Sequence, residues 1–177
     1  MLVTDLPAPL VLGLAFILGA TWGSFFNVAI YRWPRDMSVV TPPSTCPECG
    51  ARIPAARNIP IFAYLLQRGR AACCGAKLTP RYVVVEILSA LHLVALAQRF
   101  IVRAEDGTLL ATAGLETATW FVFVGGLVIA TFVDLEWLEI PDEVTMGGTA
   151  IGLATLSLRP ELEPLEAALG AGAGFLV

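Results

Sequence analysis

Four carboxylic acids are crowded into nine residues of this chain, directly after a long uncharged stretch. Asp134, Glu136, Glu139 and Asp142 follow residues 117–133, which hold no charged side chain. An acid at the end of an apolar helix is costly unless it is paired, so such acids are candidates for acid–base chemistry. The alternative is a solvated bend whose acids cap two helices, with Asp142 as N-cap of the second. Asp134 fits this alternative less well, because it continues the helix of its apolar neighbours, and the stretch alone supports both interpretations equally.

Four cysteines offer a second kind of chemistry. Cys46 and Cys49 stand in the sequence Cys-Pro-Glu-Cys-Gly, a turn that directs two thiolates to one point, and Cys73 and Cys74 follow after a spacer. Two such pairs hold one tetrahedral zinc ion and stabilise a small module that has little core. The second pair is the weaker one, because adjacent cysteines are expected to point in different directions. The alternative is one structural pair with two spare thiols, and zinc is the favoured interpretation.

Another acid and the only histidine lie in the apolar residues 82–98. His92 has no His-Glu-x-x-His or Gly-x-Ser-x-Gly motif beside it, so we expect a packed side chain rather than a metal ligand or a triad member. Glu86 lies within about a turn of the start of this stretch. From there it could contact the same face as Asp134.

These side chains need helices to position them, and the chain has apolar stretches of suitable length. No charge occurs between Asp5 and Arg32, which leaves room for a membrane-spanning helix of roughly 20 residues. Further spans are expected at residues 82–98, 117–133 and 144–158, with an outer loop at 159–166 and a fifth apolar segment from residue 167. The expected fold is an all-α polytopic membrane protein with a small cysteine-bearing insert between the first two helices.

Composition and charge agree with a membrane protein and set its orientation. The chain is 56% hydrophobic with a mean hydropathy of +0.75, which excludes an ordinary soluble domain. The net charge of −4 hides an asymmetry, because residues 32–81 hold eight bases and two acids. Segments rich in Lys and Arg stay cytoplasmic, so the insert and the bend at 134–142 are expected inside and the N-terminus outside. A reducing compartment favours metal or free thiols over disulfides, and the acidic total gives no support for nucleic-acid binding.

Several short motifs follow one another in a characteristic order. They are Gly23-Ser24-Phe25 with Asn27-Val28, Tyr31-Arg32-Trp33-Pro34, Cys46-Pro47-Glu48-Cys49-Gly50, Asn58-Ile59-Pro60, Arg68-Gly69-Arg70, Pro80-Arg81-Tyr82, Glu86, and Asp134 with Ile140-Pro141-Asp142. In order and spacing this set resembles the type IV prepilin peptidases. The resemblance divides the chain into a first transmembrane helix at 1–31, a basic zinc-binding domain at 32–81 and a transmembrane peptidase domain at 82–177.

The resemblance implies an aspartic endopeptidase of the bacterial inner membrane. Its substrates would be type IV prepilins or type II secretion pseudopilins, cleaved after glycine on the cytoplasmic side. It also implies N-methylation of the new N-terminus by S-adenosylmethionine, a reaction associated with the cysteine-bearing region. Asp134 takes the place of the first catalytic aspartate, with Glu86 and Asp142 as supporting acids.

The chain departs from the family pattern in two places. The second catalytic aspartate belongs to a Gly-x-Gly-Asp motif that does not occur in these 177 residues. We expect it beyond Val177, and we expect residues 1–177 alone to be inactive. The second cysteine motif of the family reads Arg-Cys-x-x-Cys-Gly, and here Ala71 stands in place of its first cysteine, with Cys74 aligned to the last and Cys73 displaced.

A different class of function stays open beside the peptidase. A non-catalytic membrane scaffold that binds pilin segments would need neither a second aspartate nor a complete cysteine set. A small transporter is disfavoured, because the spans contain no visible inverted repeat or ion pair. If the chain does process pilins, the acids of the bend, together with Glu143, are expected to attract the basic head of the leader.

Overall fold

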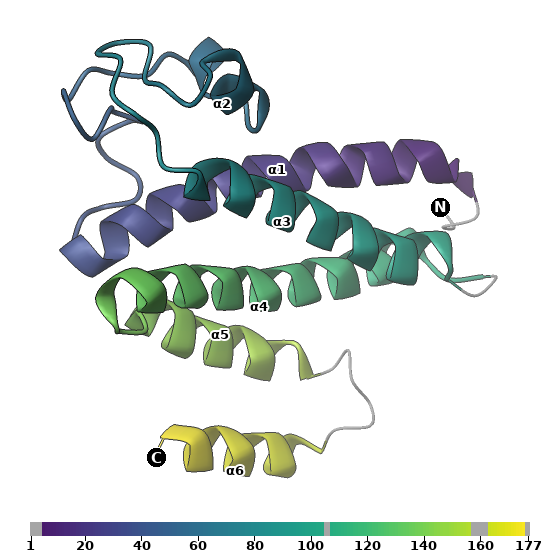
Figure 1. The fold of residues 1–177 in the computed structure, drawn as a ribbon. Helices are drawn as coiled ribbons and strands as arrows, with labels where there is room; N and C mark the ends of the chain where they lie inside the picture. Colours follow the sequence, from purple (N-terminus) through teal and green to yellow (C-terminus); the bar gives the residue numbers. More distant parts are fainter. Residues whose placement is uncertain (1–4, 105–106, 157–162, 176–177) are drawn as a thin grey trace.

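The computed structural model describes residues 5–104, 107–156 and 163–175, and these residues are mostly helical (Figure 1). The helices are α1 (Ala8–Arg32), α2 (Phe62–Leu66), α3 (Arg81–Ala97), α4 (Leu110–Trp137), α5 (Asp142–Ala154) and α6 (Pro164–Phe175). A π-helical turn at Gln98–Val102 extends α3. The described residues contain no strand, and isolated antiparallel bridges join Thr45 to Arg52 and Arg70 to Lys77. The expectation of a helical protein is therefore confirmed.

Three of the described helical stretches are long and apolar enough to cross a membrane, namely Ala8–Arg35, Arg81–Val102 and Leu110–Trp137. Many of their large apolar side chains are exposed, including Ile17 and Leu91. A surface of this kind is unfavourable in water but matches the polarity of lipid tails. The pattern is that of a membrane protein.

The later apolar segments differ from the expected spans. The third helix is longer than residues 117–133, because α4 extends at both ends. The fourth is shorter than 144–158: α5 has 13 residues, about 20 Å at 1.5 Å per residue, which is less than a hydrocarbon core of about 30 Å. Glycines inside α5 weaken the helix, and α6 has only 12 residues. Of the outer loop expected at 159–166, residues 159–162 lie outside the described residues and the chain is helical from Pro164.

Helices α1 and α3 pack closely because two glycines of α1 lie one turn apart on the buried side. A Cβ atom on Gly19 would lie 2.7 Å from the Cα of Ala90, and one on Gly23 would lie 2.7 Å from the Cα of Glu86. Both distances are too short for a real side chain. Small residues four apart let two helix backbones approach in membranes, where packing replaces the hydrophobic effect as the source of association.

Helix α4 completes the bundle by covering the same side of α1. Gly125 leaves room for the ring of Phe26, which lies 5.9 Å from the ring of Phe121 and stacks on it. Ile30 of α1, Val85 of α3 and Val133 of α4 are fully buried beside them. The three long helices therefore share one apolar core close to the end at which α4 terminates.

Residues 33–80 form the insert between α1 and α3, and they lie at the same end of the bundle as the turn between α4 and α5 (Figure 1). Two contacts join these parts. Arg81 at the start of α3 forms an ion pair with Glu136 near the end of α4. The guanidinium of Arg35 lies 4.1 Å from the ring centre of Tyr31 and 4.6 Å from that of Trp137. Bases within and next to the insert therefore contact the end of α4.

The insert is held to α1 by a buried arginine. Arg32 is 6% exposed, and its guanidinium donates to the carbonyl oxygens of Ser38 and Pro42, both at 2.8 Å. A buried guanidinium is stable only when its donors are satisfied. The side chain thus fixes the start of the insert against the last turn of the helix.

Candidate functional site

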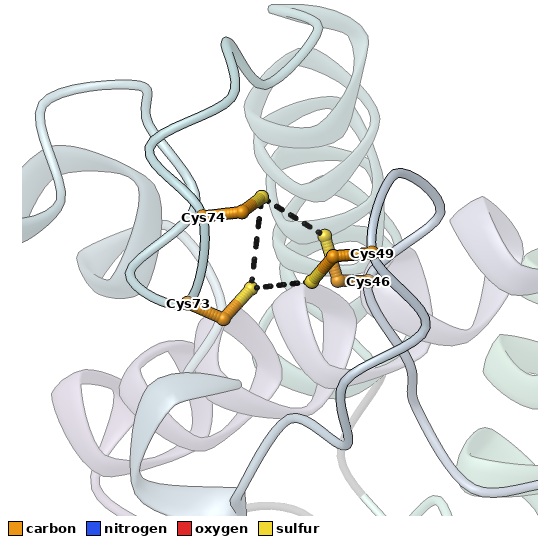
Figure 2. Close-up of side chains that lie close together, drawn as sticks. All are labelled: Cys46, Cys49, Cys73 and Cys74. Atoms are coloured by element: carbon orange, nitrogen blue, oxygen red, sulfur yellow. Dashed lines mark hydrogen bonds between the residues drawn. The ribbon is translucent and has the colours of Figure 1, made fainter.

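The four cysteines converge on one point, and their sulfur atoms lie within 4.8 Å of one another (Figure 2). The Sγ–Sγ distances are 3.8 Å for Cys46 and Cys74, 3.4 Å for Cys49 and Cys73, and 3.9 Å for Cys73 and Cys74. A tetrahedral zinc ion with bonds of about 2.3 Å separates its sulfur ligands by roughly 3.8 Å. The cluster therefore has the size of a four-thiolate metal site.

Two similar hairpins build the cluster. In the first, the N–H of Cys46 donates to the carbonyl of Ala51 and the N–H of Gly50 donates to that of Cys46, both at 2.9 Å. The second repeats this pattern at Ala71, Gly75 and Ala76, with distances of 2.8 and 2.7 Å. Gly50 and Gly75 have φ of 70° and 72°, a conformation that glycine adopts without steric cost. Ala71 thus occupies the position of Cys46.

The hairpin register explains how the second pair reaches the metal position. Cys74 corresponds to Cys49, and Cys73 corresponds to Glu48. The expectation that Cys73 and Cys74 point in different directions is wrong, because both sulfur atoms face the first pair (Figure 2). Ala71, at the position equivalent to Cys46, provides no sulfur. Cys73, two residues further along the same hairpin, supplies the fourth sulfur instead.

The sulfur atoms differ in how readily they lose a proton. The backbone N–H of Cys49 lowers the pKa of Cys46 to about 7. Sharing a proton with Cys49 raises the pKa of Cys73 to about 12, and burial together with the neighbouring thiols also raises that of Cys74. A metal would have to displace the protons that remain on these thiols, and Cys46 would lose its proton more readily than Cys73 or Cys74.

Asp134 lies one turn before the end of α4, with an exposed side chain. Its backbone carbonyl accepts the N–H of Leu138, the left-handed residue that terminates the helix, at 2.9 Å. Continuation of the helix through Asp134 is therefore confirmed. Among the described residues no side chain is hydrogen-bonded to its carboxylate, which leaves both oxygens available to a reacting group or a second acid.

Among the described residues, no hydrogen bond or ion pair joins Asp142 or Glu86 to Asp134. Asp142 is exposed and is the first residue of α5; Pro141 is the N-cap, so the expectation of an Asp142 cap is wrong. Proline before the helix fixes the backbone without a side-chain acceptor. Glu86 is 7% exposed, and its Oε2 accepts the N–H of Ile61 in the insert at 2.6 Å. Its contacts go to the insert and α1.

Three features of this region were not evident from the sequence. Ile61 has φ of 64° in a tight turn closed by the N–H of Phe62 and the carbonyl of Pro60 at 2.6 Å, which is a strained conformation for a β-branched residue. Asn27 donates to the carbonyl of Tyr82 at 2.9 Å, and its buried Oδ1 has no hydrogen-bond partner among the described residues. A cavity of about 370 Å³ lies between the insert, α1 and α3. No local pattern signals these features, because each depends on how distant segments meet.

The lone histidine has the structural role that was expected. The ring of His92 stacks on that of Phe121, with centres 6.2 Å apart, in the interior between α3 and α4. It is not part of the cysteine cluster.

Comparison with known proteins identifies the family. A family model described as bacterial peptidase A24 N-terminal domain matches residues 17–100. A prepilin leader peptidase/N-methyltransferase of Klebsiella pneumoniae is 32% identical over 174 residues, covering 91% of this chain and 68% of the relative. The chain belongs to the prepilin leader peptidase/N-methyltransferase family. Relatives of the same name from Myxococcus xanthus and Neisseria gonorrhoeae are 35% and 30% identical, each over 95% of this chain.

The prepilin peptidase relatives are longer than this chain. It spans 47% of the Myxococcus xanthus protein and 63% of the Neisseria gonorrhoeae protein. No solved structure gives a significant match. The matched family model at 17–100 includes the cysteine cluster, Glu86 and the cavity, whereas Asp134 lies after it. The family model therefore covers the insert and its contacts with the membrane helices, and the wider alignments cover most of the chain.

Proposed function

We propose that this chain is part of a membrane aspartic endopeptidase that cleaves the leader peptides of type IV prepilins or pseudopilins after glycine. The observation that carries the proposal is an exposed aspartate, Asp134, at the end of a membrane-length helix, in a chain that aligns almost throughout with prepilin leader peptidases. A leader that precedes a hydrophobic helix is presented at the membrane surface, and an acid at the end of a membrane-length helix could reach it there.

The chemistry requires Asp134 to act with a second carboxyl group. When two carboxyls share one proton, the charged one takes a proton from the attacking water and the neutral one polarises the scissile carbonyl. Asp134 has the exposure needed for this role, and we assign it as one of the two acids. Glu86 and Asp142 are supporting candidates only, since Glu86 is bonded to the insert and Asp142 begins the next helix.

We further propose that the cysteine cluster holds zinc and that the protein N-methylates the product with S-adenosylmethionine. The sulfur separations fit a tetrahedral ion, and the relatives carry both activities in their names. Zinc would be structural here, because four thiolates leave no open position for a substrate. S-adenosylmethionine would supply the methyl group to the new N-terminal amine.

The proposed location is the bacterial inner membrane, with the N-terminus outside and the insert and the bend in the cytoplasm. The bases of residues 32–81 support this orientation, and the shared end of the insert and the α4–α5 turn agrees with it.

The decisive test of the peptidase is Asp134→Asn in the full-length protein. The amide cannot take a proton from water, so leader cleavage should fall by about 100-fold or more. Precursor and mature pilin are separated by mass and quantified over time. Glu116→Gln, at the other end of the same helix, is the control and should leave cleavage unchanged. Full cleavage by Asp134→Asn would exclude the assignment and favour the scaffold.

A further inference from the structure

The cavity of about 370 Å³ lies where the insert covers the start of α3 and the second half of α1. Its volume is within the range of small-molecule sites. All three tyrosines of the chain, Tyr31, Tyr64 and Tyr82, line it, although they come from three different segments. Aromatic faces attract cations that carry methyl groups, as in sites for quaternary ammonium ligands.

A buried carboxylate lies in the wall of this cavity. Glu86 is 7% exposed and accepts a hydrogen bond from the N–H of Ile61, and Ser24 offers its hydroxyl to the same group. A backbone N–H can only donate, so Glu86 serves as the acceptor in this contact and keeps its other oxygen for a further partner. In the described residues no Lys or Arg forms an ion pair with Glu86. A buried carboxylate without a protein cation is costly, and a cationic ligand would compensate it.

A second polar atom in the cavity wall lacks a partner. Asn27 is 2% exposed and lines the cavity; its Nδ2 donates to the carbonyls of Gly23 and Tyr82, which fixes the orientation of the amide. The Oδ1 is buried and accepts no hydrogen bond from the protein. Buried acceptors are nearly always satisfied, so this atom indicates a ligand with an N–H or O–H donor.

The insert side of the cavity carries the opposite charge. Arg52 and Arg57 line it, and neither side chain has an ion-pair partner among the described residues. The lining of the cavity thus includes a carboxylate from α3, three tyrosine rings, and two guanidinium groups from the insert. Arg32 of α1 also lines the cavity, but its guanidinium donates to the carbonyls of Ser38 and Pro42. A ligand that matches has a cationic centre, a carboxylate of its own and a hydrogen-bond donor.

We propose that this cavity binds S-adenosylmethionine, with Glu86 facing its sulfonium. Arg52 or Arg57 would bind its carboxylate, and the Oδ1 of Asn27 would accept one of its N–H groups. The inference rests on the methyltransferase half of the proposed function and gives that activity a place in the fold. It also gives the insert a role, because the cavity exists only while the insert is docked on α1 and α3.

The test compares two ligands that differ in the charge on sulfur. Binding of S-adenosylmethionine and of S-adenosylhomocysteine, which has a neutral thioether, is measured by calorimetry on the full-length protein in detergent. The charged ligand should bind about tenfold more tightly. In Glu86→Gln this preference should disappear, because the amide carries no charge. Asp36→Asn, at an exposed position outside the cavity, is the control and should keep the preference.

Several outcomes would overturn the assignment. The first is that the unchanged protein binds S-adenosylhomocysteine as tightly as S-adenosylmethionine, or more tightly. The second is that Glu86→Gln still prefers S-adenosylmethionine to the same degree. Should Glu86→Gln fail to fold, a photoreactive azido-adenosine derivative of S-adenosylmethionine answers the question in the unchanged protein. Cross-links are expected in peptides from α1 and the insert, and cross-links confined to α4–α6 would refute the site.

Cleavage by the same preparation separates the two proposals. If S-adenosylmethionine binds elsewhere and the leader is still cleaved, the cavity assignment is wrong and the proposed function stands. If S-adenosylmethionine does not bind at all and the leader is still cleaved, both the cavity assignment and the methyltransferase part of the proposed function are wrong.

Discussion

The sulfur of Cys73 reaches the cluster from a position that Glu48 occupies in the first hairpin, while the position equivalent to Cys46 is held by Ala71. Ala71 is 7% exposed and Cys46 is 3% exposed, so the two sites are similarly enclosed. The second hairpin therefore keeps the geometry of the first with alanine at this position, and its additional sulfur comes from a residue two positions further along the chain. A sulfur at either position should complete the site.

This equivalence predicts a rescue. Cys73→Ala removes one thiolate and should weaken zinc binding by about 100-fold or more, since the large binding energy of a structural zinc site is shared among four ligands. Adding Ala71→Cys to the same protein should restore most of the affinity. Zinc is measured by competition with a chromophoric chelator. Ala72→Cys, at the position equivalent to Pro47, is the matched control and should restore nothing; an unaltered affinity in Cys73→Ala alone would contradict the four-cysteine site.

At the scale of elements, the seam between α1 and α3 sets the positions of the site residues. Gly23 brings the backbone of α1 against that of α3 at Glu86, and Asn27 bonds across one turn later. The cavity wall is therefore formed by residues that directly continue the glycine seam. Any change that separates the two helices should also disturb the cavity.

A pair of Gly→Ala substitutions in α1 tests the seam. Gly23→Ala puts a methyl group 2.7 Å from backbone atoms of α3, so the helices must separate, at a cost of about 1–3 kcal/mol. Gly13→Ala meets nothing within 4 Å and should be neutral or slightly stabilising, because alanine favours helix. Thermal unfolding in detergent compares the two variants. Equal unfolding temperatures would show that the close approach of α1 and α3 contributes nothing to stability.

The elements also show what could be foreseen. Long apolar stretches predicted the three membrane-length helices, and the Cys-Pro-Glu-Cys-Gly motif predicted a turn, because both signals are local. The ends of α4 and the short α5 were not foreseen, since helix ends depend on neighbouring segments as much as on composition. The convergence of Cys73 on the first pair required the second hairpin to copy the first, which spacing alone does not reveal.

At the scale of the whole molecule, basic and acidic regions are joined at one end of the bundle. The insert carries most of the bases, and the bend carries Glu139 and Asp142 as exposed acids without a described ion-pair partner. Glu136, in contrast, is paired with Arg81. The bend therefore keeps negative charge free within the nine residues that begin at Asp134, the proposed catalytic acid.

A substrate with a basic leader should use this charge. With the full-length protein, a prepilin whose leader Lys and Arg residues are changed to Gln should be cleaved more slowly at low salt, by roughly tenfold. The difference should shrink at about 1 M salt, where the screening length is about 3 Å. Initial rates at substrate concentrations below KM report the effect. Equal rates for the two substrates at low salt would show that the bend does not recruit the leader.

The hydrogen bond from the Ile61 amide to Glu86 makes one backbone proton a reporter of docking. When the insert lifts from the helices, this proton becomes free to exchange with deuterium, whereas in the docked form it is shielded by a carboxylate. Its exchange rate thus measures how often the insert opens, independently of unfolding of the membrane helices. If docking and ligand binding are linked, a ligand in the cavity slows hydrogen exchange of the Ile61 amide. The exchange rate with and without ligand then reports how strongly the ligand favours the docked insert.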